Sequence, residues 1–296
     1  MNAARVLVIG ASGLVGSAFV RRARARGLDV IGSARRVFGE ATVALDLQDP
    51  PALERVLNET APDIVVIGSA WPHVDGCEED PARSQRENVD TVRNVVELVD
   101  AKRALSNTRI VFYSTDHVFD GAKPGARYVE SDPPNPPSVY ARHKRAAEEL
   151  LLARENALIV RTAWVFGAEL RRKNFVYRVI DLANTGRPLE VPRGQAGCPT
   201  WSDWLCESTL SLLGRGMTGV VHLAGRRALT KAEWAEAIVT NLGLPALHVE
   251  EVDAAKAGQI APRPERVDLV SERCTLEQEP VEQILRRERE RLLGPA

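Results

Sequence analysis

The first half of the chain alternates short apolar runs with longer stretches in which apolar positions recur at helical spacing. The runs are almost continuous in Val, Ile and Leu, which is typical of parallel strands that helices cover on both faces. We therefore expect strands at Arg5–Ile9, Leu28–Gly32, Val43–Leu45, Ile64–Gly68, Ile110–Tyr113 and Leu158–Arg161.

The stretches between these strands carry the signals of amphipathic helices. After the first strand, Ala18, Phe19 and Ala23 recur at helical spacing and Gly27 supplies a stop signal. Strands and helices that alternate in this way predict an α/β fold with a Rossmann-like, doubly wound parallel sheet. Further helices are expected near Leu53–Glu59, Ala82–Ala104 and Tyr140–Glu155.

From about Gly167 the pattern of predicted elements changes, because turn-forming residues become more frequent and the elements become shorter. We expect a strand at Gly219–Leu223 and a helix that Thr230 opens, with Glu233 completing a capping box. We therefore predict a Rossmann domain over residues 1–166 and a smaller C-terminal lobe over residues 167–296 that is partly interleaved with it. The charged run at 286–291 is interpreted as the solvated face of a last helix.

Composition narrows the class of protein. With 44% hydrophobic and 27% charged residues and a net charge of -1, the 296 residues suit a globular protein with no global attraction to nucleic acid or to an anionic membrane. No apolar run approaches the ~18 residues of a membrane span. The cysteines are widely spaced, so we expect neither a metal site nor a disulfide framework, and a cytoplasmic location: Cys77, Cys198, Cys206 and Cys274.

A glycine-rich segment joins the first strand to the first helix, which is the context of a dinucleotide-binding loop. Gly10 permits the tight turn, Gly13 lets a pyrophosphate approach the backbone, and Gly16 lets helix and strand pack closely. Their G-x-x-G-x-x-G spacing favours the short-chain dehydrogenase branch of the fold. An ordinary β–α turn is the alternative.

The end of the second strand bears on the choice of cofactor. An enzyme that selects NAD places an acidic side chain there to hold the ribose hydroxyl, whereas this chain has Ser33, Arg35 and Arg36. A hydroxyl and two guanidinium groups suit a 2′-phosphate, so we expect NADPH rather than NADH. Both arginines could instead be merely solvated. Asp46 and Leu47, after the third strand, would lie beside the adenine.

Tyr140 and Lys144 are four residues apart, so they share one face of the predicted helix. The cation should lower the pKa of the Tyr140 phenol, which could then deliver a proton near neutral pH, while Lys144 also holds the nicotinamide ribose. Thr115 ends a buried strand at the edge where ligands bind, so its hydroxyl would orient the substrate oxygen. The residues alone thus predict a nicotinamide-dependent carbonyl reductase.

These expectations make 1–166 the NADP(H)-binding domain and leave 167–296 mainly for the substrate. The predicted catalytic residues are Thr115, Tyr140 and Lys144. The predicted cofactor-binding residues are Gly10, Ser12, Gly13, Leu14, Val15, Gly16, Ser33, Arg35, Arg36, Asp46, Leu47, Ser69, Ala70, Tyr140 and Lys144.

Several sequence blocks carry a family resemblance: GASGLVG (10–16), VDGCE (74–78), YSTDHVFDG (113–121), YARHK (140–144), RTAWVFG (161–167), GCPTW (197–201) and RPERVDL (263–269). In these blocks the chain resembles the extended short-chain dehydrogenase/reductases, and more narrowly the dTDP-4-dehydrorhamnose reductase family. The resemblance covers nearly the whole length in order. It implies NADPH-dependent reduction of a nucleotide-linked 4-keto-6-deoxysugar by a monomer or homodimer.

The resemblance also assigns residues. Thr115, Tyr140 and Lys144 match the catalytic trio of the family, and a substrate-binding set falls on its sugar-nucleotide segments: Trp164, Asn174, Gln195, Thr200 and Arg263. For Trp164, Asn174 and Arg263 the alternatives are a core side chain, a helix cap and an exposed loop arginine. The chain departs from the family at His117, where Tyr is usual, and at Cys198, where a small residue is usual. The acidic motif of a magnesium-bridged dimer has no match.

Two other functions remain open. The same scaffold serves epimerases and dehydratases, which retain their cofactor and oxidise and re-reduce one sugar. It also resembles the β subunit of methionine adenosyltransferase, a regulatory protein without catalysis of its own. The presence of both Tyr140 and Lys144 favours an enzyme.

Overall fold

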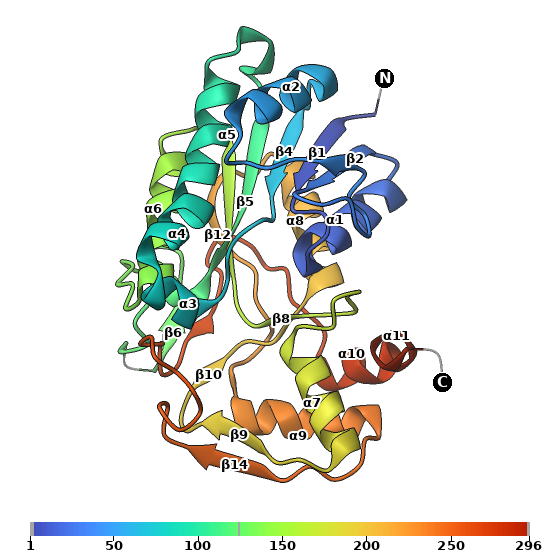
Figure 1. Cartoon of the computed structure of the whole chain (residues 1–296), viewed down its shortest axis with the longest axis vertical. Coiled ribbons are helices and arrows are strands. Elements are labelled where there is room, and N and C mark those ends of the chain that lie inside the picture. Colours follow the sequence, from blue (N-terminus) through green and yellow to red (C-terminus); the bar gives the residue numbers. More distant parts are fainter. Residues whose placement is uncertain (1–2, 124, 295–296) are drawn as a thin grey trace.

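The computed structural model describes residues 3–123 and 125–294. Its centre is a parallel sheet with the strand order β12-β7-β5-β4-β1-β2-β3, with helices on both faces (Figure 1). The predicted fold class, an α/β Rossmann-like doubly wound sheet, is confirmed. The strands are β1 (Arg5–Ile9), β2 (Asp29–Ala34), β3 (Val43–Ala44), β4 (Ile64–Ile67), β5 (Arg109–Thr115), β7 (Ala157–Thr162) and β12 (Gly219–His222).

Alternate residues of each strand bury against opposite layers, which is why the strand sequences are apolar almost throughout. In β1, Val6 and Val8 join one core cluster, and Leu7 and Ile9 join the other. The first cluster lies under α1 (Leu14–Ala25) and α8 (Ser202–Gly214), and the second under α2 (Pro50–Thr60), α5 (Thr91–Asp100) and α6 (Val139–Leu152).

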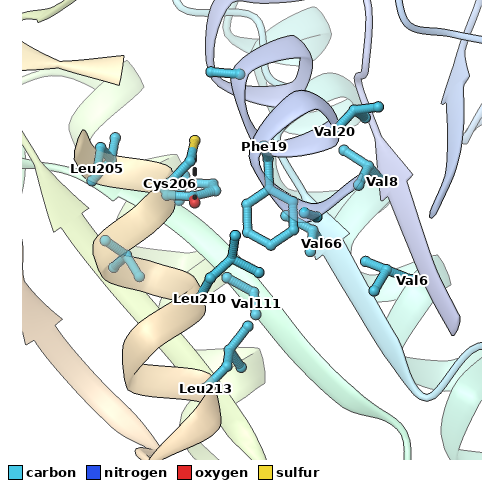
Figure 2. Packing of buried hydrophobic residues seen from close by; sticks show 14 of the residues in the cluster. Val6, Val8, Phe19, Val20, Val66, Val111, Leu205, Cys206, Leu210 and Leu213 are labelled. Carbon is cyan, nitrogen blue, oxygen red and sulfur yellow. Dashed lines mark hydrogen bonds between the residues drawn. The ribbon is translucent and has the colours of Figure 1, made fainter. Parts of the chain in front are cut away.

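Phe19 connects the two helices of the first layer. Its ring projects from α1 toward Leu210 of α8 and toward Val66 on the sheet (Figure 2). The side chain is 0% exposed. The α1–α8 contact therefore anchors a helix from the second half of the chain on the sheet of the first half.

The predicted helix at 82–104 is interrupted in the structure. It divides into α4 (Pro81–Gln85), a π-helical turn (Arg86–Asp90) and α5. The extra residue of the π turn places the buried Asn88 side chain against the Trp71 backbone, where it accepts from the amide nitrogen at 2.8 Å and donates to the carbonyl oxygen at 3.2 Å. Helical spacing could not reveal this insertion, because the hydrogen bonds that favour it come from a distant loop.

The second half of the chain builds a smaller layer and also returns to the sheet through α8 and β12, the latter beside β7 (Figure 1). The capping box of Thr230 and Glu233 is confirmed at the start of α9. No helix of the described residues is both long and apolar enough to cross a bilayer. The remaining elements are α3 (Val74–Glu79), α7 (Phe175–Thr185), α9 (Lys231–Leu242), α10 (Val281–Arg287), α11 (Arg289–Leu293), β6 (Arg127–Tyr128), β8 (Val165–Phe166), β9 (Leu189–Pro192), β10 (Ala196–Gly197), β11 (Thr200–Trp201), β13 (Leu229–Thr230), β14 (Val249–Val252) and β15 (Asp268–Leu269).

We expect Phe19→Ala to lower the free energy of unfolding by about 3 to 5 kcal/mol, because it leaves a cavity between α1, α8 and the sheet. Phe38→Ala is the control: Phe38 is 42% exposed, and its truncation should cost less than ~0.5 kcal/mol. Urea denaturation at constant pH measures both values. Equal losses in the two variants would contradict the packing role given to Phe19.

Candidate active site

A cavity of about 500 Å³ opens at the carboxyl ends of β1, β2 and β4. The chain order of the strands reverses on either side of β1, which is where open α/β sheets bind their ligands. The volume is within the range of small-molecule sites. Nine of the predicted cofactor-binding residues line it: Gly10, Ser12, Gly13, Arg35, Arg36, Asp46, Leu47, Ser69 and Ala70.

The three glycines of the loop differ in backbone conformation and in the space around a Cβ. Gly10 has φ +86, and a Cβ on it would lie 2.7 Å from the Ser69 amide nitrogen. A Cβ on Gly16 would lie 2.2 Å from the Gly10 carbonyl oxygen, so these two positions are fixed by the packing of helix on strand. Gly13 has an ordinary φ of -91, and its Cβ would meet only the Gly10 oxygen, at 3.4 Å. The space beside Gly13 is therefore open for a ligand.

The three polar residues expected to bind a 2′-phosphate have different surroundings. Arg35 lies between two carboxylates, 3.6 Å from Asp46 and 3.4 Å from Glu87. Arg36 lines the same cavity and has no ion pair among the described residues. The prediction for Ser33 is corrected, because this residue is fully buried and its hydroxyl donates to the Val8 carbonyl oxygen inside the sheet. Arg36 is thus the free cation of the set.

The remaining predicted residues of the glycine loop do not line the cavity and lie in the first turn of α1. Leu14 and Val15 begin this helix, whose first amides have no carbonyl partner within the helix and point toward its open end. Arg171 was not predicted, since no motif surrounds it. It extends from the segment between β8 and α7 to line the cavity, where its guanidinium donates to Ser12 Oγ at 3.2 Å.

The second group of predicted residues lies on α6. This helix begins where the Ser138 side chain accepts from the Ala141 amide, and where Glu78 of α3 accepts from the Val139 amide at 2.9 Å. Capping from both sides fixes the first turn, which carries Tyr140. One turn later the Lys144 ammonium donates to the Tyr113 carbonyl oxygen at 2.7 Å.

The pKa of Tyr140 in this pair differs from the prediction. Burial and the charge of Asp116 raise the pKa of Tyr140 above its ordinary value, although a hydrogen bond with Thr115 acts in the opposite direction. Burial lowers the pKa of Lys144 to about 7, against the attraction of Glu148. The expected lowering of the Tyr140 pKa by Lys144 is therefore wrong. In this structure the phenol keeps its proton at neutral pH.

Thr115 lies where β5 ends, beside Tyr140. Its hydroxyl accepts from the His117 amide at 3.2 Å and donates to Asp116 Oδ1 at 3.1 Å, which fixes the rotamer of the side chain. The His117 ring meets the Tyr140 ring edge to face, with centroids 5.9 Å apart. The structure thus brings the hydroxyl, the phenol and an imidazole together at the same edge of the sheet.

A buried ion pair lies behind this group. Glu148 of α6 accepts from Arg161 of β7 at 2.9 and 2.7 Å and from the Ser114 hydroxyl at 2.5 Å. Both charged side chains are almost inaccessible, with exposed fractions of 0% and 2%. Hydrogen bonds from Arg161 keep the pKa of the Glu148 carboxyl below its usual value, although burial opposes this.

The predicted substrate-binding residues divide into two groups. Asn174 is the N-cap of α7, as its alternative interpretation proposed, because its side chain accepts from the Val176 amide. Thr200 is fully buried, and its hydroxyl donates to the Cys198 carbonyl and accepts from the Gly225 amide. These two side chains are occupied by contacts within the protein.

The other three residues contact different parts of the chain. Arg263 does not project from an exposed loop, since it forms a paired contact with Asp75 at 2.9 and 2.6 Å. The Gln195 amide exchanges hydrogen bonds with Gln259. The half-buried Trp164 has a positive φ of 42, and its indole lies against Gly197, where a Cβ would come within 2.6 Å of the ring. Trp164 thus occupies a strained backbone conformation, which is common at ligand sites.

Comparisons with known proteins place this arrangement in a family. A family model described as the RmlD substrate binding domain matches residues 4–290. The spore coat polysaccharide biosynthesis protein SpsK of Bacillus subtilis is 31% identical, with 88% of this chain and 87% of the relative covered. The dTDP-4-dehydrorhamnose reductase of Mycobacterium tuberculosis is 31% identical as well, over 88% of this chain and 82% of its own.

A solved structure gives the same architecture. The dTDP-4-dehydrorhamnose reductase of Bacillus anthracis, crystallised in complex with NADP, has a TM-score of 0.83 to this chain and covers 96% of it, with 98% of its own chain covered. The sequence identity is 24%, so this likeness concerns the fold.

We expect the free energy of unfolding to decrease as the pH is lowered, because of Glu148. Its pKa is lower in the folded protein than the ordinary 4.5, so its stabilising charge is fully present above pH ~4.5 and is lost as the pH falls through the folded pKa. Glu148→Gln should cost about 3 to 5 kcal/mol at pH 7, because it leaves Arg161 buried without a counter-charge. Below pH ~4.5 the difference from the wild type should shrink.

The control is Glu149→Gln, because the Glu149 side chain is 60% exposed and pairs only with Arg145 on the surface. This variant should stay within ~0.5 kcal/mol of the wild type at both pH values. Urea denaturation at pH 7 and pH 4 tests both variants. A constant difference between Glu148→Gln and wild type at the two pH values would contradict the role of the ion pair.

Proposed function

The chain belongs to the RmlD substrate binding domain family, and on this premise we propose that it is an NADPH-dependent reductase of a nucleotide-linked 4-keto-6-deoxysugar. The observation that carries the proposal is the position of Thr115, Tyr140 and Lys144. Thr115 ends β5 at the carboxyl edge of the sheet, next to β4, whose end lines a cavity with a glycine loop that suits a dinucleotide. Tyr140 lies beside Thr115, and Lys144 follows one turn later on α6. The similarity to the dTDP-4-dehydrorhamnose reductase of Mycobacterium tuberculosis supports the substrate class.

The residues of the cavity fit NADPH. Gly13 leaves open space beside the first turn of α1, where backbone amides can receive a pyrophosphate. Arg36 is free to pair with a 2′-phosphate, and Arg171 can close over the pyrophosphate from the other side. When bound, the cofactor supplies a hydride for the substrate carbonyl.

The chain's own residues handle the proton and the orientation of the substrate. When the substrate binds, the Thr115 O–H would turn from Asp116 Oδ1 to the carbonyl oxygen and fix its position. Tyr140 gives its proton to the alkoxide, which is a stronger base than phenolate, so a phenol that is neutral at pH 7 suits this step. Lys144 uses one of its three N–H donors on the Tyr113 carbonyl and keeps the others for the ribose hydroxyls and Tyr140.

The same proposal assigns a ligand to each part of the chain. Residues 1–166 bind NADPH and residues 167–296 bind mainly the sugar nucleotide, with Trp164 and Gln195 beside the sugar. Both small molecules belong to the cytoplasm, where we place the enzyme. A monomer or homodimer stays a prediction.

An NADPH-oxidation screen tests the activity. We expect the purified protein to oxidise NADPH with at least one of the dTDP-, UDP- and GDP-linked 4-keto-6-deoxysugars, and Tyr140→Phe to lower kcat by about 10²- to 10⁴-fold, because it removes the proton donor. Tyr113→Phe is the control. It keeps the carbonyl that holds Lys144, while its hydroxyl contacts Thr209 of α8 away from the site.

The results separate the rival functions. Turnover of a sugar nucleotide without net consumption of NADPH would identify an epimerase or dehydratase. Copurification with a larger enzyme, together with no oxidation of NADPH by any substrate, would identify a regulatory subunit. Full turnover by Tyr140→Phe would refute the assigned proton donor.

We expect Arg36→Ala to raise the KM for NADPH by about 10- to 100-fold and to leave the KM for NADH nearly unchanged, because only NADPH carries the phosphate that Arg36 would bind. Arg55→Ala, which removes an exposed arginine of α2, is the control and should change neither value. Initial rates with each cofactor measure the effect. A proportional loss with both cofactors would show that Arg36 does not recognise the 2′-phosphate.

A further inference from the structure

Lys231 is the first residue of α9 and is held among aromatic rings. Its ammonium nitrogen lies 3.4 Å from the centroid of the Trp164 ring and 4.7 Å from that of Phe175. Among residues 3–123 and 125–294, no carboxylate forms an ion pair with it and no acceptor takes a hydrogen bond from it. Apart from the two ring contacts, its N–H donors thus have no partner among these residues.

The placement of this charge is unfavourable for the protein alone. Lys231 begins α9, so its ammonium lies at the end of the helix where the dipole is positive. Burial lowers its pKa to about 7, and the nearby Arg178 and Arg263 act in the same direction. Asp116 is the opposing charge, and its carboxylate is already hydrogen-bonded to Thr115. A lysine whose pKa is perturbed in this way, beside aromatic rings and without an ion pair among the described residues, is typical of a binding site.

The position of Lys231 connects it to the active site. Its charge acts on His117, whose ring contacts Tyr140. The buried His117 Nδ1 also has no hydrogen-bond partner among the described residues. Lys231 is therefore within electrostatic range of the imidazole that contacts Tyr140.

We propose that Lys231 binds the diphosphate of the nucleotide sugar and so positions the sugar ring for Tyr140. A diphosphate supplies the negative charge that Lys231, under the influence of the Arg178 and Arg263 charges, lacks, whereas a sugar hydroxyl supplies none. Arg263, which the family resemblance suggested for this role, is neutralised by its paired contact with Asp75. The inference rests on the proposed function, since it assumes a nucleotide sugar in this site.

Lys231→Met tests the proposal, because it keeps an unbranched side chain over Trp164 and removes the charge. We expect KM for the nucleotide sugar to rise by about 10- to 100-fold, with kcat changed by less than ~3-fold. Lys231→Arg should recover most of the affinity. Lys173→Met, at an exposed lysine of the same lobe, should match the wild type. If the Met variant does not fold, Lys231→Gln replaces it.

Calorimetry with free nucleotides tests whether Lys231 contacts the diphosphate or the sugar. Of dTDP, UDP and GDP, the one that the wild type binds most tightly should bind Lys231→Met about 10- to 100-fold more weakly. If only the complete nucleotide sugar loses affinity and the free nucleoside diphosphate does not, the ammonium contacts the sugar and the proposal is wrong. Unchanged affinities for both would also refute it.

The two proposals can fail separately. Turnover of nucleotide sugars by the wild type, with a Lys231→Met variant of unchanged KM, would leave the reductase in place and remove the role of Lys231. Binding of a nucleoside diphosphate that depends on Lys231, without oxidation of NADPH, would support the diphosphate site and remove the reductase.

Discussion

The buried pair of Glu148 and Arg161 fixes the helix that carries the catalytic side chains to the strand behind it. Two charges with exposed fractions of 0% and 2% depend on their mutual hydrogen bonds, and Arg161 Nη1 has no other partner among the described residues. The pair therefore tolerates little rotation or sliding of α6 against β5 and β7. Since Tyr140 lies two turns before Glu148 on the same helix, the fixed position of Glu148 also fixes the position of the phenol.

Other carboxylates around the site also hold neighbouring segments together by hydrogen bonds. Asp75 of α3 accepts from Arg263 and from the Ile260 and Ala261 amides, which holds the loop before β15. Glu78 of the same short helix holds the first turn of α6. One element thus connects the helix that carries Tyr140 with the loop of the C-terminal segment. A site on two such connected parts can bind a cofactor from one and a substrate from the other.

Charge is distributed unevenly over these two parts. In the cavity at the end of the sheet, Arg35 is balanced by Asp46 and Glu87, while Arg36 is not. In the C-terminal part, Arg263 is balanced and Lys231 is not. Arg36 and Lys231 are thus cations without an ion pair among the described residues, which suits a reaction between two ligands that both carry phosphate groups.

The sequence by itself predicted the fold class, most strands of the sheet and the glycine loop, because parallel strands buried on both faces and such a loop depend on local pattern. It also brought out Thr115, Tyr140 and Lys144, whose spacing places them on one strand end and one helix face. Tertiary structure alone decided their electrostatics: the burial and the Asp116 charge that raise the Tyr140 pKa come from contacts across the fold. The burial of Ser33, the pairing of Arg263 with Asp75 and the place of Lys231 over Trp164 were equally beyond the sequence, because each joins segments that no periodicity relates.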